Sequence, residues 1–416
     1  MAAARQVRQQ HSALARRSRR PNSRPMAQPL DFDSTRLPSP HLTDAHEAWR
    51  RTVRAFVDKE IAPFVNEWDE AEGFPRALHK KAAEIGLIGL GYPEEYGGVR
   101  EGVDLFHSLI ASEELARAGA GGLIAGLMTH GIGLPPIIAL GSEELKRRIA
   151  PPVLSGDRLI ALCVTEPSGG SDVANIRTRA RREGGDYVVN GEKTYITSGM
   201  RADFLTVAVR TGGEGASGLS FLLIEADSPG VTRTKLDKMG WWMSDTAAIH
   251  FDDVRVPAEN LIGAENGGFA GIVANFNMER LSMASQAIAF ARICIEDAAG
   301  WARERQTFGK PLSKHQAIRH KFAEMLRHVH ASSALLDNCA WRVMNGETPV
   351  AELSLLKVQA TRTMEFCARE AMQILGGAGF IRGQRVERIY REVRVMAIGG
   401  GSEEIMLDLA ARQTGL

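Results

Sequence analysis

The chain has 416 residues, with 51 Lys or Arg against 50 Asp or Glu, and a formal net charge of +1 at pH 7. That length accommodates two or three domains with a large core. Residues 1–30 hold seven Arg and no acid, which leaves 44 basic and 50 acidic side chains in the rest of the chain. This mildly acidic body argues against a nucleic-acid-binding protein, and no apolar run of 18 or more residues predicts a membrane span.

The N-terminal segment, residues 1–40, is predicted to be a basic, disordered tail because it is rich in Arg, Pro and Ser. Its acid-free start has the composition of an organelle transit peptide. A flexible basic tail and an upstream start codon, with Met26 as the true initiator, are the two alternatives. We therefore expect the mitochondrial matrix if the segment is a transit peptide, and the cytoplasm if the protein is bacterial.

Helical patterning characterises residues 41–157, which we interpret as an N-terminal helical domain. The Thr43 hydroxyl is placed to cap the first helix, which runs to Pro63. Further helices are predicted at 75–86, 103–118, 121–139 and 142–155.

The hydrophobic period changes from 3.6 to 2 over residues 158–262, the predicted central β-domain. Short strands are expected at 159–165, 175–182, 186–189, 204–210, 219–225, 231–236 and 247–256. Asn190-Gly191 after the strand Tyr187–Val189 is a hairpin signal. This spacing indicates a small antiparallel barrel or sandwich.

Long helices return over residues 263–416, at 267–303, 313–345, 349–375, 383–394 and 403–413. They predict a C-terminal four-helix bundle that also packs against a partner subunit. The order of helices, strands and helices, without alternating βαβ units, argues against a Rossmann sheet. The four cysteines (163, 294, 339 and 367) form no C-x-x-C pair, and no His cluster has metal-ligand spacing, so reduced thiols and no metal are expected.

The stretch 162–199 has the most informative composition in the chain. A short strand stops at Pro167 and is followed by a Gly/Ser turn rich in N–H groups and hydroxyls, which suits an anionic or carbonyl-rich ligand. Further on, Tyr195 stands between Thr194 and Thr197, an arrangement that suits a planar ring needing hydrogen bonds at its edge. An ordinary β-hairpin with a polar turn is the alternative.

These segments resemble the flavin-binding signature of the acyl-CoA dehydrogenase family, Thr-Glu-Pro-x-x-Gly-Ser-Asp (165–172) and Asn-Gly-x-Lys-x-x-Ile-Thr (190–197). Family motifs recur in order at 91–98, 251–257, 305–312, 373–380 and 399–405, so the resemblance covers about 42–413. It implies an FAD-dependent enzyme that converts an acyl-CoA to its trans-2-enoyl-CoA. It also implies a homotetramer that passes electrons to an electron-transfer flavoprotein.

Dehydrogenation across Cα–Cβ requires a base for the α-proton, and Glu279 is the best candidate. It shares one helical face with Ile272, Phe276 and Met283, and no cation stands at i±3 or i±4. An ion pair with an arginine of another helix is the alternative. Most of the family carries the base where this chain has Gly400. Asn277-Met278-Glu279-Arg280 instead resembles the isovaleryl-CoA and long-chain acyl-CoA dehydrogenases, which carry it on this helix.

The resemblance also assigns contacts residue by residue. For FAD it implies Leu162, Val164, Thr165, Ser171, Tyr195, Ile196, Thr197, Arg305, Phe308, Gln316, Gln373, Gly376, Gly377, Ser402, Glu403 and Glu404, with Arg305, Phe308 and Gln316 reaching the cofactor of a neighbouring subunit. For the acyl-CoA it implies Ser171, Asn277, Met278, Arg280, Gly400 and Gly401, with the Gly400 N–H available to the thioester oxygen. Glu403 and Glu404 are the competing carboxylates for the base.

Two other functions stay open at this point. One is a flavoenzyme of the same fold acting on an acyl-carrier protein, or performing desulfination or nitroalkane oxidation. The other is a catalytically silent binding protein, which the acidic residues near the C-terminus disfavour. Chain length and branching of the substrate are left undetermined, with a preference for long or branched chains because of the base position.

Overall fold

The computed structural model describes residues 29–415, apart from the side chains of 270 and 272–277. Residues 1–30 form a unit separate from Asp31–Leu416, and the second unit is the one described below. The predicted tail over 1–40 therefore lies mostly outside the described residues.

The N-terminal part of the described chain is a layer of helices, and its first cap is confirmed. The Thr43 side chain accepts a hydrogen bond from the His46 N–H and begins α2. The helices are α2 (Asp44–Phe56), α3 (Val65–Glu70), α4 (Ala77–Glu84), α5 (Leu105–Ala116), α6 (Gly121–Leu127), α7 (His130–Gly133), α8 (Pro135–Leu140) and α9 (Glu143–Leu154). A π turn, Val57–Ile61, and a 3-10 turn, Ala62–Phe64, connect α2 to α3.

The single helix predicted over 121–139 is wrong, because α6, α7 and α8 are separate short helices there. Pro135 and Pro136 explain the last break, since a proline has no N–H to donate to the helix before it.

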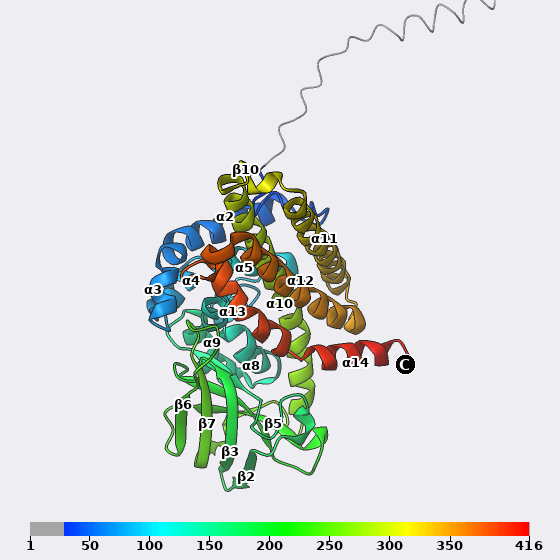
Figure 1. The fold of residues 1–416 in the computed structure, drawn as a ribbon. Helices are drawn as coiled ribbons and strands as arrows, with labels where there is room; N and C mark the ends of the chain where they lie inside the picture. Colours follow the sequence, from blue (N-terminus) through cyan, green and yellow to red (C-terminus); the bar gives the residue numbers. More distant parts are fainter. Residues whose placement is uncertain (1–28, 416) are drawn as a thin grey trace, which may run out of the picture. The chain divides into compact units, whose positions relative to one another are not determined.

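The central part of the chain is a mixed sheet, shown below the helices in Figure 1. Its strands are β1 (Ile160–Cys163), β2 (Arg179–Glu183), β3 (Asp186–Thr197), β4 (Phe204–Arg210), β5 (Leu219–Glu225), β6 (Val231–Lys235), β7 (Thr246–Pro257) and β8 (Leu261–Ile262). Their order is β6-β7-β3-β2-β4-β5-β8, with β1 added on β4. Most pairs are antiparallel, whereas β1 and β2 each pair with β4 in parallel. Alternate residues such as Val189, Leu205 and Phe251 build the core of this sheet.

The hairpin predicted at Asn190-Gly191 is wrong, because β3 runs straight through both residues. The register against β7 shifts between Val189 and Gly191, so the glycine marks a bulge rather than a turn. A Cβ on Gly191 would lie 2.6 Å from Thr178 Cα, which explains why only glycine fits there. The hairpin turn falls instead at Gly184-Gly185, between β2 and β3.

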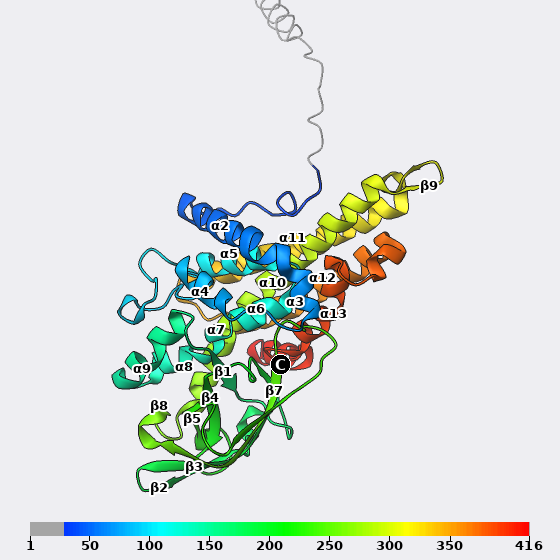
Figure 2. The same ribbon diagram turned by 90° about the vertical axis from the view of Figure 1, so that its left-hand side faces the viewer.

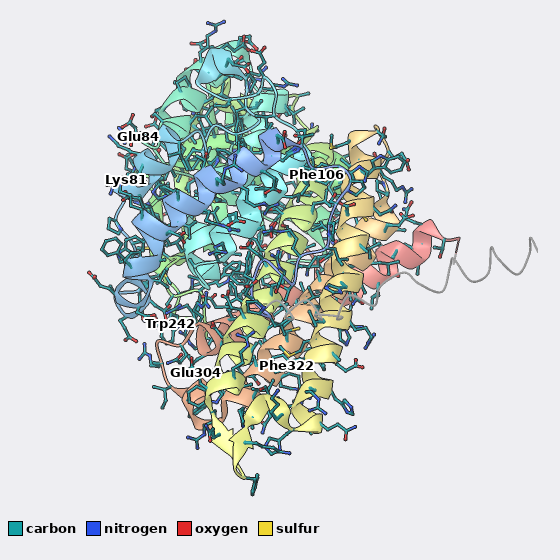
Figure 3. The ribbon with its side chains drawn as sticks, turned by 90° about the horizontal axis from the view of Figure 1, so that it is seen from above. Lys81, Glu84, Phe106, Trp242, Glu304 and Phe322 are labelled. Atoms are coloured by element: carbon teal, nitrogen blue, oxygen red, sulfur yellow. The ribbon has the colours of Figure 1, made fainter. Side chains whose placement is uncertain are left out.

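The C-terminal part consists of long helices, confirming the predicted helical region. They are α10 (Gly268–Glu304), α11 (Gln316–Met344), α12 (Val350–Leu375), α13 (Arg385–Ile398) and α14 (Glu403–Gln413). A small hairpin of β9 (Gln306–Thr307) and β10 (Lys310–Pro311) joins α10 to α11. Seen from above, Glu304 and Phe322 lie at the same end of the α10–α11 pair (Figure 3). The four cysteines are buried free thiols.

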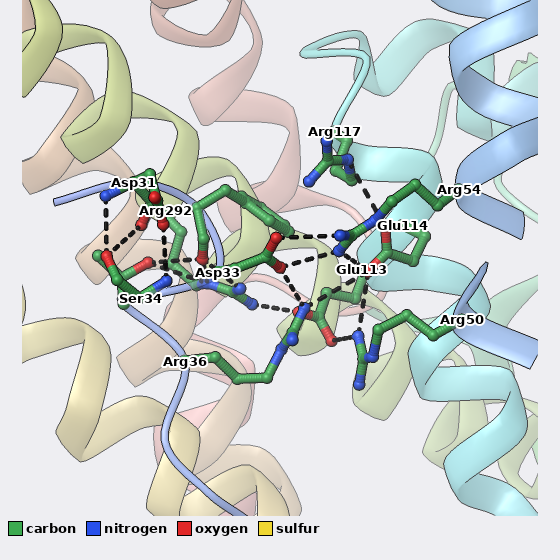
Figure 4. A network of polar contacts seen from close by, with 12 residues as sticks. Asp31, Asp33, Ser34, Arg36, Arg50, Arg54, Glu113, Glu114, Arg117 and Arg292 are labelled. Atoms are coloured by element: carbon green, nitrogen blue, oxygen red, sulfur yellow. Dashed lines mark hydrogen bonds and ion pairs between the residues drawn. The ribbon is translucent and has the colours of Figure 1, made fainter. Parts of the chain in front are cut away.

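Residues 31–36 depart from the disorder expected for 1–40, because Phe32 and Thr35 are buried. Arg292 of α10 donates to the Phe32 carbonyl and to Thr35 Oγ1, and its guanidinium lies 3.9 Å from the centre of the Phe32 ring. Around them, Arg50 and Arg54 of α2 pair with Glu113 and Glu114 of α5 (Figure 4). This strap ties the start of the described chain to α2, α5 and α10, which lie together in Figure 2.

Among the described residues, no single helix is long and apolar enough to cross a membrane; only the bent pair Gly121–Leu127 and His130–Leu140 passes that test when its halves are combined.

Candidate active site

The two segments of the flavin signature meet in the fold. The Thr194 N–H donates to the Thr165 carbonyl over 2.9 Å, which places the turn after β1 beside the end of β3. Val164 is buried, Leu162 and Thr165 are half-buried, and Ser171 is exposed. The polar turn therefore lies open to solvent on a rigid base, as a ligand-binding loop requires.

Tyr195 has an unusual backbone conformation. Its φ is +59°, at a shift of register between Lys193 and Ile196 against β7. Ile196 stays buried and Thr197 half-buried, whereas 71% of the Tyr195 side chain is exposed. A left-handed tyrosine is strained and persists where the surrounding structure enforces it, often at ligand sites. The exposed ring beside the Thr165 turn fits a flat heteroaromatic group such as a flavin.

Glu279 lies on α10 against a glycine turn that connects α13 to α14. A Cβ built on Gly400 would lie 3.8 Å from Glu279 Oε1 and 2.7 Å from Met283 Sδ. Gly400 has φ +66°, a backbone conformation that favours glycine. The Met283 side chain thus occupies the space that a side chain at position 400 would take, and the Glu279 carboxyl lies next to that space.

Burial raises the pKa of Glu279 to about 7, while Arg280 and Lys357 act to lower it. Among the described residues Glu279 forms no ion pair, so the arginine partner considered from the sequence is not found there. The side chains of Ile272 and Phe276, which share its predicted face, lie outside the described residues. A half-buried carboxyl that titrates near neutral pH has the properties of a general base.

The competing carboxylates have different surroundings. Glu403 accepts two hydrogen bonds from the Arg362 guanidinium, at 3.1 and 2.9 Å. Glu404 is exposed, and hydrogen bonds from its own backbone and from Ser402 lower its pKa. Glu403 is therefore held by an arginine and Glu404 has a lowered pKa, which makes both poorer candidates for the base than Glu279.

The residues expected to contact the acyl-CoA divide into three groups. Arg280 is buried and donates from Nε to the Gly400 carbonyl over 3.4 Å, and Gly401 follows in the same turn. Met278 is 47% exposed on the open side of α10. The side chain of Asn277 lies outside the described residues.

Six of the predicted flavin contacts lie elsewhere in the chain. Arg305 is 26 residues beyond Glu279, which corresponds to about 40 Å along α10. Phe308, whose side chain is 96% exposed, lies between β9 and β10, and Gln316 begins α11. Figure 1 shows β10 at the top of the molecule. Gln373, Gly376 and Gly377 precede α13, whose Arg385 pairs with Glu296 near the same end of α10. Within one copy of the chain, Arg305, Phe308 and Gln316 are therefore far from Glu279.

Two buried lysines were missed in the analysis of the sequence. Lys193 donates to the Val164 carbonyl and to Glu166, inside the flavin signature. Lys357 donates to the carbonyls of Ala397 and Gly401, next to the glycine turn. Each had a signal, because a lysine stands among residues that the strand or helix period assigns to the core.

Three potential metal ligands, His46, Asp104 and His107, also come together. They are better explained as helix caps. The N–H of Thr43 donates to His46 Nδ1, so Nε2 carries the proton that His46 donates to Asp104 over 2.8 Å. Asp104 in turn caps α5 through the His107 N–H. The lone pairs that a metal would need are used in these bonds.

Known proteins provide the remaining evidence. Models of the N-terminal, middle and C-terminal domains of acyl-CoA dehydrogenase match residues 43–157, 161–254 and 266–415. Acyl-CoA dehydrogenase AFT10-1 of Alternaria alternata is 38% identical over 94% of this chain and 95% of its own. A probable acyl-CoA dehydrogenase from Mycobacterium abscessus is 49% identical, with a TM-score of 0.88 over 90% of this chain and 99% of its own.

A glutaryl-CoA dehydrogenase from Mycobacterium smegmatis in complex with FADH2 has a TM-score of 0.84 and 29% identity, over 90% of this chain and 95% of its own. The three matched domains together span most of the described residues. The chain therefore belongs to the acyl-CoA dehydrogenase family of FAD-dependent oxidoreductases.

Proposed function

We propose that Glu279 is the base that removes the α-proton of an acyl-CoA in its conversion to the trans-2-enoyl-CoA. The observation that carries this role is that Glu279 Oε1 lies 3.8 Å from the position that a Cβ on Gly400 would take, in a place where burial raises the pKa of the carboxyl to about 7. At that pKa the carboxylate is present at neutral pH and still basic enough to accept a proton.

The residues around Glu279 account for the rest of the proton transfer. Among the described residues no acceptor for the Gly400 N–H is found, so this donor is available to the thioester oxygen. A hydrogen bond to that oxygen stabilises the negative charge that develops when Glu279 takes the α-proton. FAD, when bound, supplies the hydride acceptor for the β-carbon. Val164, Thr165, Ser171, Tyr195, Ile196 and Thr197 would hold its ring, and Ser402, Glu403 and Glu404 would complete this part of the site.

A second copy of the chain completes the flavin site in this proposal. Arg305 lies about 40 Å along α10 from Glu279, and Phe308 and Gln316 follow it, too far to serve the same flavin. Gln373 lies about 24 Å along α12 from Lys357, which contacts the turn beside Glu279, and Gly376 and Gly377 follow it. Gly376 and Gly377 have open space where a Cβ would point, as close backbone approach to a pyrophosphate requires. A homotetramer built from two such pairs fits this division. Hybrids of Arg305→Ala and Glu279→Gln subunits should then recover activity that neither variant has alone.

We further propose a long or branched acyl chain and an electron-transfer flavoprotein as the electron acceptor. Support for the chain type is the base position on α10, which resembles that of the isovaleryl-CoA and long-chain enzymes. Reduction of the acceptor by the acyl-CoA-treated enzyme tests the partner.

Anaerobic titration of the flavin-loaded enzyme with straight and branched acyl-CoAs tests the base and the substrate class together. The wild type should bleach rapidly with one chain class. Glu279→Gln should bind that acyl-CoA but reduce its flavin about 10²- to 10⁴-fold more slowly than the wild type. Glu365→Gln, an exposed carboxylate on α12 that pairs with Arg394, is the matched control and should behave as the wild type.

The same titration distinguishes the alternatives. Reduction of Glu279→Gln at the wild-type rate would show that another group takes the proton. A wild type that bleaches only with acyl-carrier-protein thioesters would keep the base and change the substrate carrier.

A further inference from the structure

The glycine turn beside Glu279 has little means of holding its own shape. Gly399, Gly400 and Gly401 connect α13 to α14, and the last two have φ values of +66° and +108°. Glycine loses more backbone freedom on folding than any other residue, so this turn requires contacts from outside itself. Any N–H in it that is to meet a substrate oxygen must be fixed to within a fraction of an ångström.

Lys357 provides such a contact from α12. Its side chain is fully buried, and Nζ donates to the Ala397 carbonyl over 2.9 Å and to the Gly401 carbonyl over 2.7 Å. These carbonyls stand on the two sides of Gly400. Ala397 lies in the last turn of α13, where the helix dipole attracts a cation. One ammonium group therefore bridges the turn at both ends.

The burial of Lys357 is costly, and no carboxylate offsets it by direct pairing among the described residues. Lysine is rarely fully buried unless it is paired with an acid, and burial lowers the pKa of Lys357 to about 8. A residue needed only to fill the core at this position of α12 would be an apolar one, as its neighbours Leu353, Leu356 and Ala360 are. The retained ammonium thus indicates a role at the turn it contacts.

The charges around Glu279 give Lys357 a second effect. Arg280 on α10 and Lys357 on α12 both act to lower the pKa of Glu279. Glu403 and Glu404 on α14 act on Lys357 in turn. Arg280 also donates to the Gly400 carbonyl, so the two cations hold consecutive carbonyls of the turn.

We propose that Lys357 is a positioning residue for the reaction, holding the Gly399–Gly401 turn so that the Gly400 N–H stays fixed beside the carboxyl of Glu279. The inference rests on the proposed role of Glu279 as base. Lys357 touches neither reactant in it, and acts through the turn and through its charge.

The test compares the flavin-loaded wild type with Lys357→Met, using the acyl-CoA that bleaches the wild type fastest. Flavin reduction at saturating acyl-CoA should be slower by about 10- to 100-fold in Lys357→Met, because the donor is displaced. The half-saturating concentration should change little. The variant lacks a cation that favours the carboxylate form of Glu279. The acid limb of its profile of flavin-reduction rate against pH should therefore move to higher pH, and the difference in rate from the wild type should shrink as pH rises.

Ser354→Ala is the matched control, because Ser354 is fully buried one turn before Lys357. Among the described residues its hydroxyl donates only to the Val350 carbonyl of its own helix. It should keep the wild-type rate and acid limb. A Lys357→Met enzyme with the wild-type rate, or with a deficit equal at every pH, would overturn the proposal in favour of simple helix packing.

If Lys357→Met loses its flavin, two further variants at this position test the proposal. Lys357→Arg keeps the charge and Lys357→Gln keeps only a donor, so the acid limb should stay in place for the first and move to higher pH for the second. Equal limbs would overturn the proposal. Failure of the base itself has a different signature, because Glu279→Gln would then be reduced like the wild type whatever the Lys357 variants do.

Discussion

Lys193 and Glu166 form a buried ion pair that joins the two segments of the flavin signature. Lys193 Nζ lies 2.8 Å from Glu166 Oε1 and 3.0 Å from the Val164 carbonyl, and neither side chain is appreciably exposed. The Glu166 carboxylate also accepts the N–H groups of Arg177 and Thr178. Three separate pieces of chain thus converge on this pair, directly behind the turn expected to hold the flavin.

Lys193→Met should therefore destabilise the protein strongly. It leaves the Glu166 carboxylate buried without a cation, a loss that costs about 3–5 kcal/mol in comparable pairs. Denaturant unfolding of flavin-free protein measures the change, and retention of the yellow cofactor on dialysis should fall with it. Lys81→Met breaks an exposed pair with Glu60 and serves as the control, with no measurable change expected. Equal stability of the two variants would show that the buried pair does not hold the segment.

The strap of residues 31–36 makes a second prediction about stability. Arg292 donates to the Phe32 carbonyl and to Thr35 Oγ1, pairs with Glu113, and stacks on the Phe32 ring. Arg292→Lys keeps the charge but loses the planar group that makes these contacts together. The free energy of unfolding should fall by about 1–3 kcal/mol.

Arg412→Lys is the matched control, because Arg412 forms one exposed pair with Asp408. Its unfolding curve should coincide with that of the wild type. If Arg292→Lys also coincides with the wild type, the charge alone holds the strap and the ring contact contributes nothing measurable.

The element types were predictable from the sequence because hydrophobic period and capping are local. The change from period 3.6 to period 2 and back located the three regions, and Thr43 marked the first cap. The prediction of a hairpin at Asn190-Gly191 failed for a non-local reason. Gly191 is needed because β3 passes close to the Thr178 backbone there, and the sequence pattern does not reveal that approach. The prediction of one helix over 121–139 failed because a mainly apolar composition concealed the breaks between α6, α7 and α8.

The candidate site was predictable only in part. Glu279 drew attention because no cation stands one turn away, but its position beside the Gly400 turn brings together residues about 120 positions apart and needs the fold. Lys193 and Lys357 stood out of period in a core strand and a core helix, so the sequence contained a signal for both. What it lacked was their acceptors, which are backbone carbonyls and carry no sequence identity. The catalytic and flavin roles themselves stay predictions.

Glu279→Gln should be more stable than the wild type at alkaline pH while being inactive. The pKa of this carboxyl rises from 4.5 to about 7 on folding, so the native state holds its proton more tightly than the unfolded state. Below pH 4.5 both states are protonated and burial of the group has no charge penalty. As pH rises from 4.5 to 7 the wild type loses stability through this group, and above 7 the loss is complete, up to about 3 kcal/mol. Glutamine stays neutral and avoids it.

Thermal or denaturant unfolding of both proteins, at equal flavin content, should give the same stability near pH 5 and a growing advantage for Glu279→Gln up to about pH 8. Glu392, whose burial also raises its pKa to about 7, adds a similar slope to each curve and cancels in the difference. A difference that is constant with pH would mean that Glu279 is not a buried acid titrating near neutrality. If Glu279→Gln is less stable than the wild type at pH 8, the Glu279 carboxylate has a partner that stabilises its charge. Either of these two results would remove the electrostatic basis for Glu279 as the base.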